Sequence, residues 1–383
     1  MNIFLYLGSS ANWEVLPQSQ VWTRNLLPAF QRLASEVYFP SFDVGQQIMA
    51  CIGQSPGVAP ADARARYSDI LVQDVKRVHQ KHGLDLFFSY MASVQVLPEA
   101  IDAIRGLGIP TVNFYCNAAH QFHQVAEIAP HFDWCMVPEA QAVPKYREAG
   151  ARPVHIQMAA DPDTYRPYEV AEAFDVTFVG QRYLNRPDVI AYLNWHGVDA
   201  RAWGPHWRDV ITWEDQQPWH WHVRRLPGKL KRAAQRGLGI EPAWYTPPRR
   251  ACGPSLSDED MVGMYSRSRI SLNISEVRDE ITGEIKRHIR LRDFEGPMSG
   301  AFFVTGYQEE LAGYYEIGRE IVCYDTKEEL LDKVRYYLRH PDVRQRIRLA
   351  GLNRARRDHT WERRLRQLLR ETGVAPKPRP NVL

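Results

Sequence analysis

The stretch Asp175-Val-Thr-Phe-Val179-Gly180 is followed by a helical pattern from Arg186 to His196 and by a second apolar run from Asp199 to Trp203. A strand, a helix and another strand in this order form the unit from which parallel sheets are built. Gly180 comes directly after the first strand, so its backbone can turn sharply or approach a ligand closely. This stretch predicts an α/β fold with a parallel sheet.

The same alternation of strands and helices continues in both directions. Before residue 160, apolar runs predict strands at 2–7, 37–39, 84–90, 111–114 and 134–137, and helical spacing predicts helices at 21–33, 62–82, 98–107, 120–128 and 139–149. After it, strands are expected at 270–274, 301–305 and 320–324, and helices at 257–266, 289–298, 327–339, 343–356 and 361–370. Turn-forming residues at 160–163 separate the two series. We therefore expect two parallel-sheet domains that face each other across a cleft.

Length, charge and cysteine content exclude several classes of protein. A chain of 383 residues with 44% hydrophobic and 24% charged residues is long enough for two globular domains. Its net charge of +3 is too small for a chain whose main task is to coat nucleic acid, and no apolar run reaches the roughly 20 residues that cross a bilayer. The five cysteines form no Cys-x-x-Cys pair, which argues against a disulfide framework or a zinc knuckle. We expect a cytoplasmic protein.

An insert from Gly204 to Gly253 interrupts the strand and helix rhythm of the second domain. Six of the eleven tryptophans lie between 203 and 244, and the stretch 224–250 holds eight basic residues and one acid. Tryptophan faces can stack on sugar rings, so the insert, with Trp207, is a candidate acceptor site. The basic segment 222–250 can alternatively contact an anionic membrane or the bases of nucleic acid, although we expect no nucleic-acid partner. A lid packed by its own tryptophans remains an equal alternative.

Polar residues follow the strands of the second domain, where ligands bind to parallel sheets. Gly180, Arg182 and Arg186 combine a glycine with two arginines at the start of a helix, which favours a phosphate; a plain strand end with solvated arginines is the alternative. Weaker candidates of the same kind are Asn273 and Ser275, and Gly8 after the first strand of the chain, each of which a loop start or tight turn also explains.

The strongest candidate is a cluster of cations before a predicted helix. Four basic residues lie within seven positions, namely Lys286, Arg287, Arg290 and Arg292. Cations crowded at a helix start are unfavourable unless an anion compensates them, and a diphosphate would do so. Glu295, three residues after Arg292, can accept two hydrogen bonds from ribose hydroxyls, and Gly300 opens the next strand. The alternative is a surface helix with an Arg292–Glu295 ion pair.

These segments resemble a known family of enzymes. The stretch 292–305 resembles the donor-site motif of glycosyltransferases with the two-domain B architecture (GT-B), in particular the spore-maturation-type, group 1-like bacterial family. Further similar segments are 132–137 with 144–150, 159–162, and 174–180 with Arg186. The resemblance implies two Rossmann-like domains: an acceptor domain at 1–160 and a nucleotide-sugar donor domain at 161–358. Residues 359–383 would form a final helix that packs back on the first domain, followed by a loose tail.

The resemblance also implies the activity: transfer of a sugar from a nucleotide-sugar donor to an acceptor hydroxyl, with no metal and no other cofactor. Glu295 would grip the ribose, Arg292 and Gly180 would line the diphosphate pocket, and Arg186 would match the arginine after the glycine loop. Negative charge grows on the diphosphate as the glycosidic bond breaks, so Arg292 is also a catalytic candidate. The acceptor would be a glycan, a protein or a small molecule.

The chain departs from the family pattern at two positions. Arg287 stands where related retaining enzymes often carry a glutamate, and Asn117 stands where family members often carry an aspartate. His120 and His123 follow the strand expected at 111–114, so His120 is a candidate proton acceptor, and Asn117 and His123 are candidates at the acceptor. The alternative is that both histidines are ordinary residues of the following helix. Two other functions stay open: a nucleotide-sugar 2-epimerase of the same architecture, and a binding protein that keeps the nucleotide pocket without catalysis.

Overall fold

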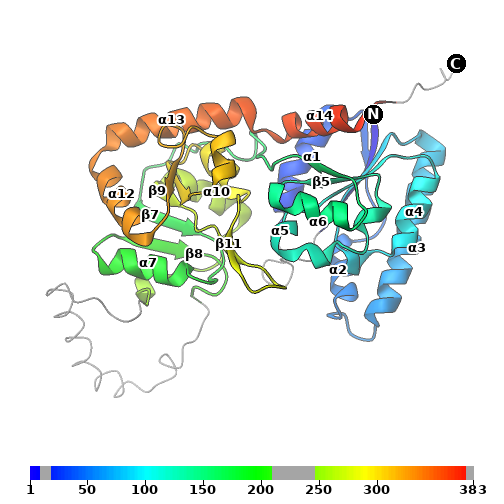
Figure 1. The fold of residues 1–383 in the computed structure, drawn as a ribbon, viewed down its shortest axis with the longest axis horizontal. Coiled ribbons are helices and arrows are strands. Elements are labelled where there is room, and N and C mark those ends of the chain that lie inside the picture. Colours follow the sequence, from blue (N-terminus) through cyan, green and yellow to red (C-terminus); the bar gives the residue numbers. More distant parts are fainter. Residues whose placement is uncertain (9–18, 209–245, 377–383) are drawn as a thin grey trace. The chain divides into compact units, whose positions relative to one another are not determined.

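The computed structural model describes residues 1–8, 19–208 and 246–376 (Figure 1). The chain divides into two compact units. Unit 1 comprises Met1–Tyr165, Val277–Glu295 and Arg354–Leu383, and unit 2 comprises Arg166–Glu276 and Gly296–Asn353. Both units are therefore discontinuous in sequence, whereas the domain boundaries expected from the sequence are contiguous and stay a prediction.

Unit 1 is built on a six-stranded parallel sheet. Its strands are β1 (Asn2–Leu7), β2 (Glu36–Tyr38), β3 (Leu86–Tyr90), β4 (Thr111–Phe114), β5 (Trp134–Val137) and β6 (Pro153–His155). They pair in the order β2-β1-β3-β4-β5-β6, with every neighbouring pair parallel. The step from β1 to β2 runs opposite to the later steps, so right-handed crossovers place helices on both faces.

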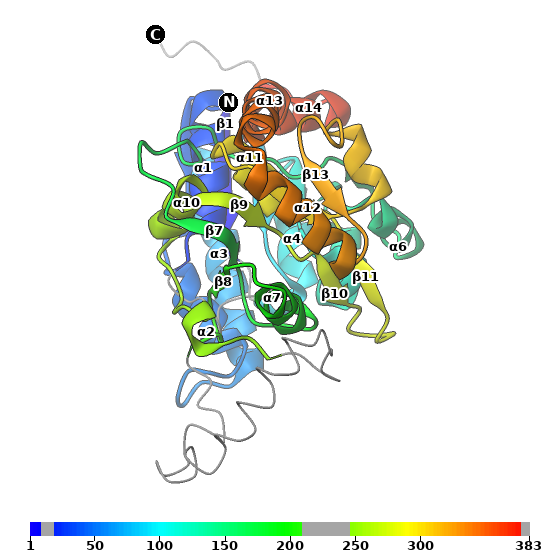
Figure 2. The same ribbon diagram turned by 90° about the vertical axis from the view of Figure 1, so that its left-hand side faces the viewer.

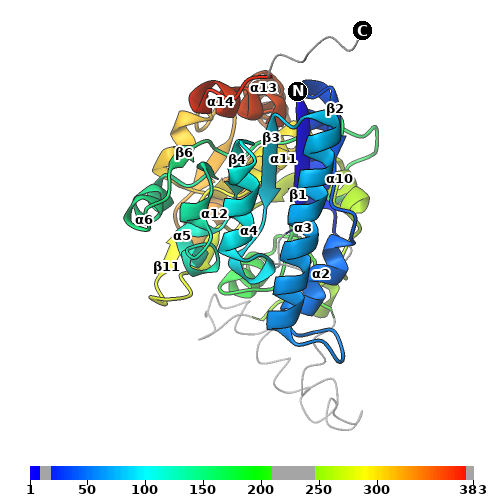
Figure 3. The same ribbon diagram turned by 90° about the vertical axis from the view of Figure 1, so that its right-hand side faces the viewer.

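Helices cover both faces of this sheet. The described helices are α1 (Val21–Leu33), α2 (Val44–Cys51), α3 (Pro60–His82), α4 (Pro98–Gly106), α5 (Ala118–Gln121), α6 (Val143–Glu148) and α14 (Trp361–Thr372). Helix α1 packs against α14, while α3 and α4 lie side by side (Figure 3). The fully buried Trp361 of α14 donates from its indole Nε1 to the Asn25 side-chain oxygen of α1, at 3.0 Å.

Unit 2 repeats the architecture with five parallel strands. They are β7 (Phe174–Val179), β8 (Ala200–Trp203), β9 (Ser268–Leu272), β12 (Phe303–Gly306) and β13 (Val322–Tyr324), in the order β13-β12-β9-β7-β8. Helices α7 (Arg186–Trp195), α10 (Asp258–Arg267), α12 (Lys327–Arg339) and α13 (Pro341–Asp358) accompany the sheet, with α7 and α12 in contact (Figure 2). The α/β class with two parallel sheets, expected from the sequence, is confirmed.

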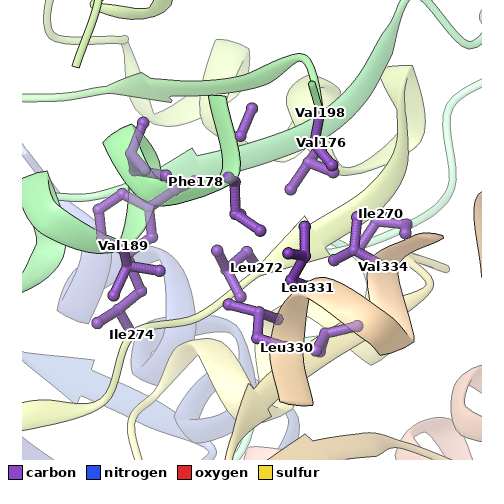
Figure 4. Close-up of a cluster of buried hydrophobic side chains, with 14 of the residues drawn as sticks. Val176, Phe178, Val189, Val198, Ile270, Leu272, Ile274, Leu330, Leu331 and Val334 are labelled. Carbon is purple, nitrogen blue, oxygen red and sulfur yellow. The ribbon is translucent and has the colours of Figure 1, made fainter. Parts of the chain in front are cut away.

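An apolar core holds the sheet of unit 2 to its helices. Val176, Phe178 and Leu272 of the strands belong to one buried cluster with Val189 of α7 and Leu330 of α12 (Figure 4). All of these side chains are buried, and Phe178 and Leu330 have no exposed surface. Because apolar burial is the main favourable term in folding, this cluster fixes the strands whose ends carry the polar candidates.

Several elements differ from the sequence expectation. The helix expected at 289–298 begins later, as α11 (Arg292–Met298), and Lys286 and Arg287 lie in a strand, β11 (Ile285–Arg287), instead of near a helix start. That strand pairs with β10 (Glu276–Arg278) in a hairpin that the periodicity did not predict. The helix expected at 120–128 is only the short α5, followed by 3₁₀ turns. Most of the insert at 204–253 lies outside the described residues.

Within the described part of the chain, no helix combines the length and the apolar character that a membrane crossing requires.

Leu330→Ala should lower the free energy of unfolding by about 2–5 kcal/mol, because it deletes a side chain with no exposed surface and leaves a cavity. Leu349→Ala is the matched control, since Leu349 is 48% exposed, and its effect should stay within about 0.5 kcal/mol. Urea denaturation measures both. Equal losses would mean that Leu330 does not anchor α12.

Candidate functional site

The loop after β7 in unit 2 has a backbone fixed by its neighbours. The Trp207 indole Nε1 donates to the Gly180 carbonyl oxygen at 2.7 Å, and Gly180 N donates to Trp203 O at 2.8 Å. Gly204 has φ +137°, and a Cβ there would lie 2.4 Å from the Gly180 oxygen, so only glycine fits. Trp207, expected at the acceptor, is 3% exposed and holds this loop; its acceptor role stays a prediction.

The two arginines of this loop differ in their surroundings. Arg186 is 5% exposed; its Nη1 donates to Gln181 O at 2.9 Å, and its guanidinium lies 5.3 Å from the ring centre of Phe178. The buried Arg186 side chain therefore stabilises the loop by its hydrogen bond to the Gln181 carbonyl. Arg182 is half-buried and its backbone N donates to Pro205 O at 3.0 Å. Of the two, Arg182 is the better placed to meet a ligand.

Small polar residues lie at the end of β9 and after α11. Asn273 and Ser275 have no exposed surface, and Asn273 Nδ2 donates to Thr305 Oγ1 at 3.1 Å. The hydroxyls of Ser275 and Ser299 are buried and have no hydrogen-bond partner among the described residues. Gly300, next to Ser299, has φ +70° and ends the helix. Ser299 was not predicted, although its place just before that glycine was a usable signal.

In unit 1, the β10–β11 hairpin neutralises part of the predicted cation cluster. Lys286 Nζ lies 3.1 Å from Glu284 Oε2 and 3.6 Å from Asp279 Oδ2. Asp279 Oδ1 accepts from the backbone N–H groups of Ile281 and Thr282, both at 3.0 Å. The Thr282 N–H, followed by that of Ile281 and the ammonium groups of Lys145 and Lys286, lowers the pKa of Asp279 to about 2. An external anion is not needed to compensate Lys286.

Arg290 and Arg292 remain as the cationic pair. Burial, and then the charge of Arg292, lower the pKa of Arg290 to about 10. The side chain of Arg292 forms no ion pair with Glu295 and no hydrogen bond within the described residues, and its Nε is buried. The surface ion pair that was the alternative explanation is thus absent. Two like charges held close together favour an anion between or beside them.

Glu295 belongs to a buried polar network of unit 1. It is 2% exposed, and its Oε1 accepts from Asn25 Nδ2 at 3.1 Å. The same Asn25 nitrogen lies 3.1 Å from the Tyr165 hydroxyl. One carboxylate oxygen of Glu295 is therefore engaged inside the protein, and its ribose role stays a prediction.

A second buried cluster joins three segments of unit 1. His120 lies on α5, Glu139 two residues after β5, and His288 just after β11. His288 Nδ1 is 2.7 Å from Glu139 Oε1, and the His120 and His288 rings are 5.0 Å apart between centres. Glu139 Oε2 accepts from Ala119 N at 2.7 Å. Burial, and then His288, lower the pKa of His120 to about 3, so His120 is neutral near pH 7.

The remaining candidates of unit 1 have contacts with residues other than His120, Glu139 and His288. His123 is 44% exposed and its Nε2 lies 3.4 Å from Glu280 Oε2. The side-chain oxygen of Asn117 accepts weakly from Cys116 Sγ at 3.5 Å. Gly8 N donates to Tyr90 O at 3.1 Å, and the residues that follow Gly8 lie outside the described part. The structure therefore brings His120 together with His288 and Glu139, and the position of Glu139 just after a strand could have marked it as a candidate.

Asp279→Asn should remove a pH-dependent stabilisation of the hairpin. The pKa of Asp279 in the folded state, about 2, lies below the ordinary 3.8, so the stabilisation is complete above pH 3.8 and is lost as the pH falls toward 2. Asparagine can still accept the two backbone N–H bonds but carries no charge. We expect a loss of about 1 kcal/mol at pH 7, reduced from the full value by solvent screening, and a smaller difference at pH 3.

Urea midpoints at the two pH values measure this effect. Glu316→Gln is the control, because Glu316 forms an exposed pair with Arg319 and should change stability by less. A loss for Asp279→Asn that is as large at pH 3 as at pH 7 would contradict the charge explanation.

Comparison with known proteins gives a family match for part of the chain, and a fold for the whole of it. Residues 188–370 match the family model described as glycosyl transferase-like. Similar solved structures include sucrose-phosphate synthase from Thermosynechococcus elongatus (TM-score 0.57, 13% identity, 98% of this chain and 100% of that one) and Anabaena HepE with UDP and glucose (0.58, 12%, 98% and 100%). An alpha-glucosyltransferase with UDP and a 13-mer DNA is also similar (0.56, 11%, 97% and 99%). No curated protein matches the sequence.

At these identities the solved structures establish the fold and not the substrates. The likeness extends over nearly the whole chain in each case, and the neighbours are GT-B glycosyltransferases. The expected resemblance to GT-B glycosyltransferases is confirmed, while the finer spore-maturation-type assignment stays a prediction. Residues 188–370 thus match the glycosyl transferase-like family, and the chain as a whole has the GT-B fold of glycosyltransferases.

Proposed function

We propose that the protein transfers a hexose from a nucleoside-diphosphate sugar to a hydroxyl group of an acceptor. The observation that carries this proposal is the match of residues 188–370 to the glycosyl transferase-like family, on a chain with the GT-B fold. Structures of HepE and of the alpha-glucosyltransferase contain UDP, so a uridine diphosphate sugar is the first donor to test.

The donor phosphates require positive or hydrogen-bonding groups, and the described residues offer both. In unit 2, the fixed loop at Gly180 and the buried hydroxyl of Ser275 follow parallel strands, where phosphates commonly bind. At the start of α11, Arg292 has no ion-pair partner among the described residues. We assign the stabilisation of the departing diphosphate to Arg292, with Arg290 as its neighbour. On this proposal, Mg²⁺ or Mn²⁺ is not needed at the diphosphate.

The pKa of His120 bears on its expected role as the proton acceptor. A catalytic base works best when its pKa lies near the working pH. The pKa of His120 is lowered to about 3, which makes it a weak acceptor in this environment. The catalytic role of His120 stays a prediction. The same holds for the acceptor roles of Asn117 and His123 and for membrane contact through 222–250. The last segment lies mostly outside the described residues.

Incubation with a panel of nucleotide sugars tests the proposal. Nucleotide released only when an acceptor is added supports transfer. Conversion of the donor to its epimer without any acceptor would instead identify a 2-epimerase, and tight binding without turnover would identify a binding protein. Adding Mg²⁺ or Mn²⁺ should leave the transfer rate unchanged.

Arg292→Ala should weaken the binding of a nucleoside diphosphate by about 1.5–3 kcal/mol, the range for losing a charged hydrogen-bond partner. It should leave the binding of the bare nucleoside unchanged, because the nucleoside has no phosphate. Arg319→Ala is the control, since Arg319 is exposed and pairs with Glu316 at 2.9 Å. Isothermal titration of the unchanged protein and of both variants with each ligand measures these affinities. An equal loss for nucleoside and nucleoside diphosphate would remove Arg292 from the phosphate site.

A further inference from the structure

The second buried cluster of unit 1 has the geometry of a metal site. One potential ligand atom each from His120, Glu139 and His288 lies within 4.8 Å of the other two. The three residues are 7%, 2% and 2% exposed, so the cluster is closed off from solvent by the protein. They come from three segments that are far apart in sequence, and only the fold brings them together.

A His288–Glu139 ion pair alone does not explain this arrangement. That pair accounts for the 2.7 Å contact between His288 Nδ1 and Glu139 Oε1. It leaves His120 Nδ1 buried with no hydrogen-bond partner among the described residues. A buried polar atom without a partner is unfavourable, and a neutral imidazole nitrogen with a lone pair is also what a metal ion requires. A cation held by all three side chains accounts for both observations.

We propose that His120, Glu139 and His288 bind one Zn²⁺ ion in unit 1. Two imidazole nitrogens and one carboxylate oxygen are a zinc donor set, whereas Mg²⁺ prefers oxygen ligands. The Ala119 N–H holds the other oxygen of Glu139 at 2.7 Å, which is the kind of contact that orients a metal-binding carboxylate. Arg290 is a cation that acts on His120, and the carboxylate of Glu139 acts on both residues with the opposite sign.

The ion would act as a structural clip. It would join the segment after the β10–β11 hairpin to α5 and to the segment after β5, and so fix the approach to α11, where Arg290 and Arg292 lie. This proposal goes beyond the proposed function, and no step of sugar transfer passes through the ion. It also gives His120 a role other than that of proton acceptor.

Zinc binding is measured on the full chain without a histidine tag, after dialysis against a chelator and then against chelator-free buffer. Calorimetric titration with ZnCl₂ should show one equivalent bound, and the melting temperature should rise with zinc. His120→Ala and His288→Ala should each lower zinc affinity at least tenfold, by the loss of a ligand. His155→Ala is the matched control, an exposed histidine of the same unit, and should bind zinc as the unchanged protein does.

Cobalt spectroscopy tests the site without any variant that could fail to fold. Co²⁺ bound by these ligands should give a visible absorption band, which one equivalent of Zn²⁺ removes and excess Mg²⁺ does not. The proposal is overturned if the unchanged protein binds no zinc, or if zinc leaves the cobalt spectrum unaltered. It is equally overturned if His120→Ala abolishes sugar transfer while zinc affinity stays the same. Nucleotide titration is a separate measurement, so failure of the donor proposal would be recognised independently.

Discussion

Parallel strands impose one constraint from which most of this protein's chemistry follows. Within the six-stranded and the five-stranded sheet every strand runs in the same direction, so the loops that leave the carboxyl ends of the strands emerge at one edge. In unit 2 this places the Gly180 loop and the Asn273–Ser275 turn after neighbouring strands, β7 and β9. In unit 1 the same rule applies to α5 and Glu139, which follow the paired strands β4 and β5. Polar groups collect at these edges because the strands themselves are filled with apolar side chains.

The cations in and around the β10–β11 hairpin divide into those that stabilise the fold and one that is available for a substrate. Charges within the hairpin compensate one another. Asp279 accepts two backbone N–H hydrogen bonds and forms ion pairs with Lys145 and Lys286. Arg292, which follows the hairpin, has no ion-pair partner among the described residues, and burial, then the charge of Arg292, lower the pKa of Arg290. A cation that the fold leaves without a partner is available for a substrate, while a compensated one stabilises the fold. This difference is the reason for assigning the donor phosphate to Arg292.

The glycine loop illustrates how packing prepares a site. Trp207 and Gly204 both come from the segment that follows β8, and both touch Gly180. The indole holds the Gly180 carbonyl, and the missing side chain of Gly204 allows the two backbones to approach. A loop that the protein already holds in one conformation loses less conformational entropy when it binds a ligand. The tryptophan that the sequence suggested for an acceptor therefore contributes to rigidity.

The sequence alone determined the fold class, most of the strands and the family resemblance. Strand and helix periodicities are local properties of the chain, and the motif at 292–305 is contiguous. The tertiary structure decided how the cations divide, because Asp279, Lys145 and Lys286 meet only when the hairpin folds onto its unit. It also decided the His120, Glu139 and His288 cluster. Those residues are up to 168 positions apart in sequence, and no local pattern reveals that three distant side chains will share one buried space.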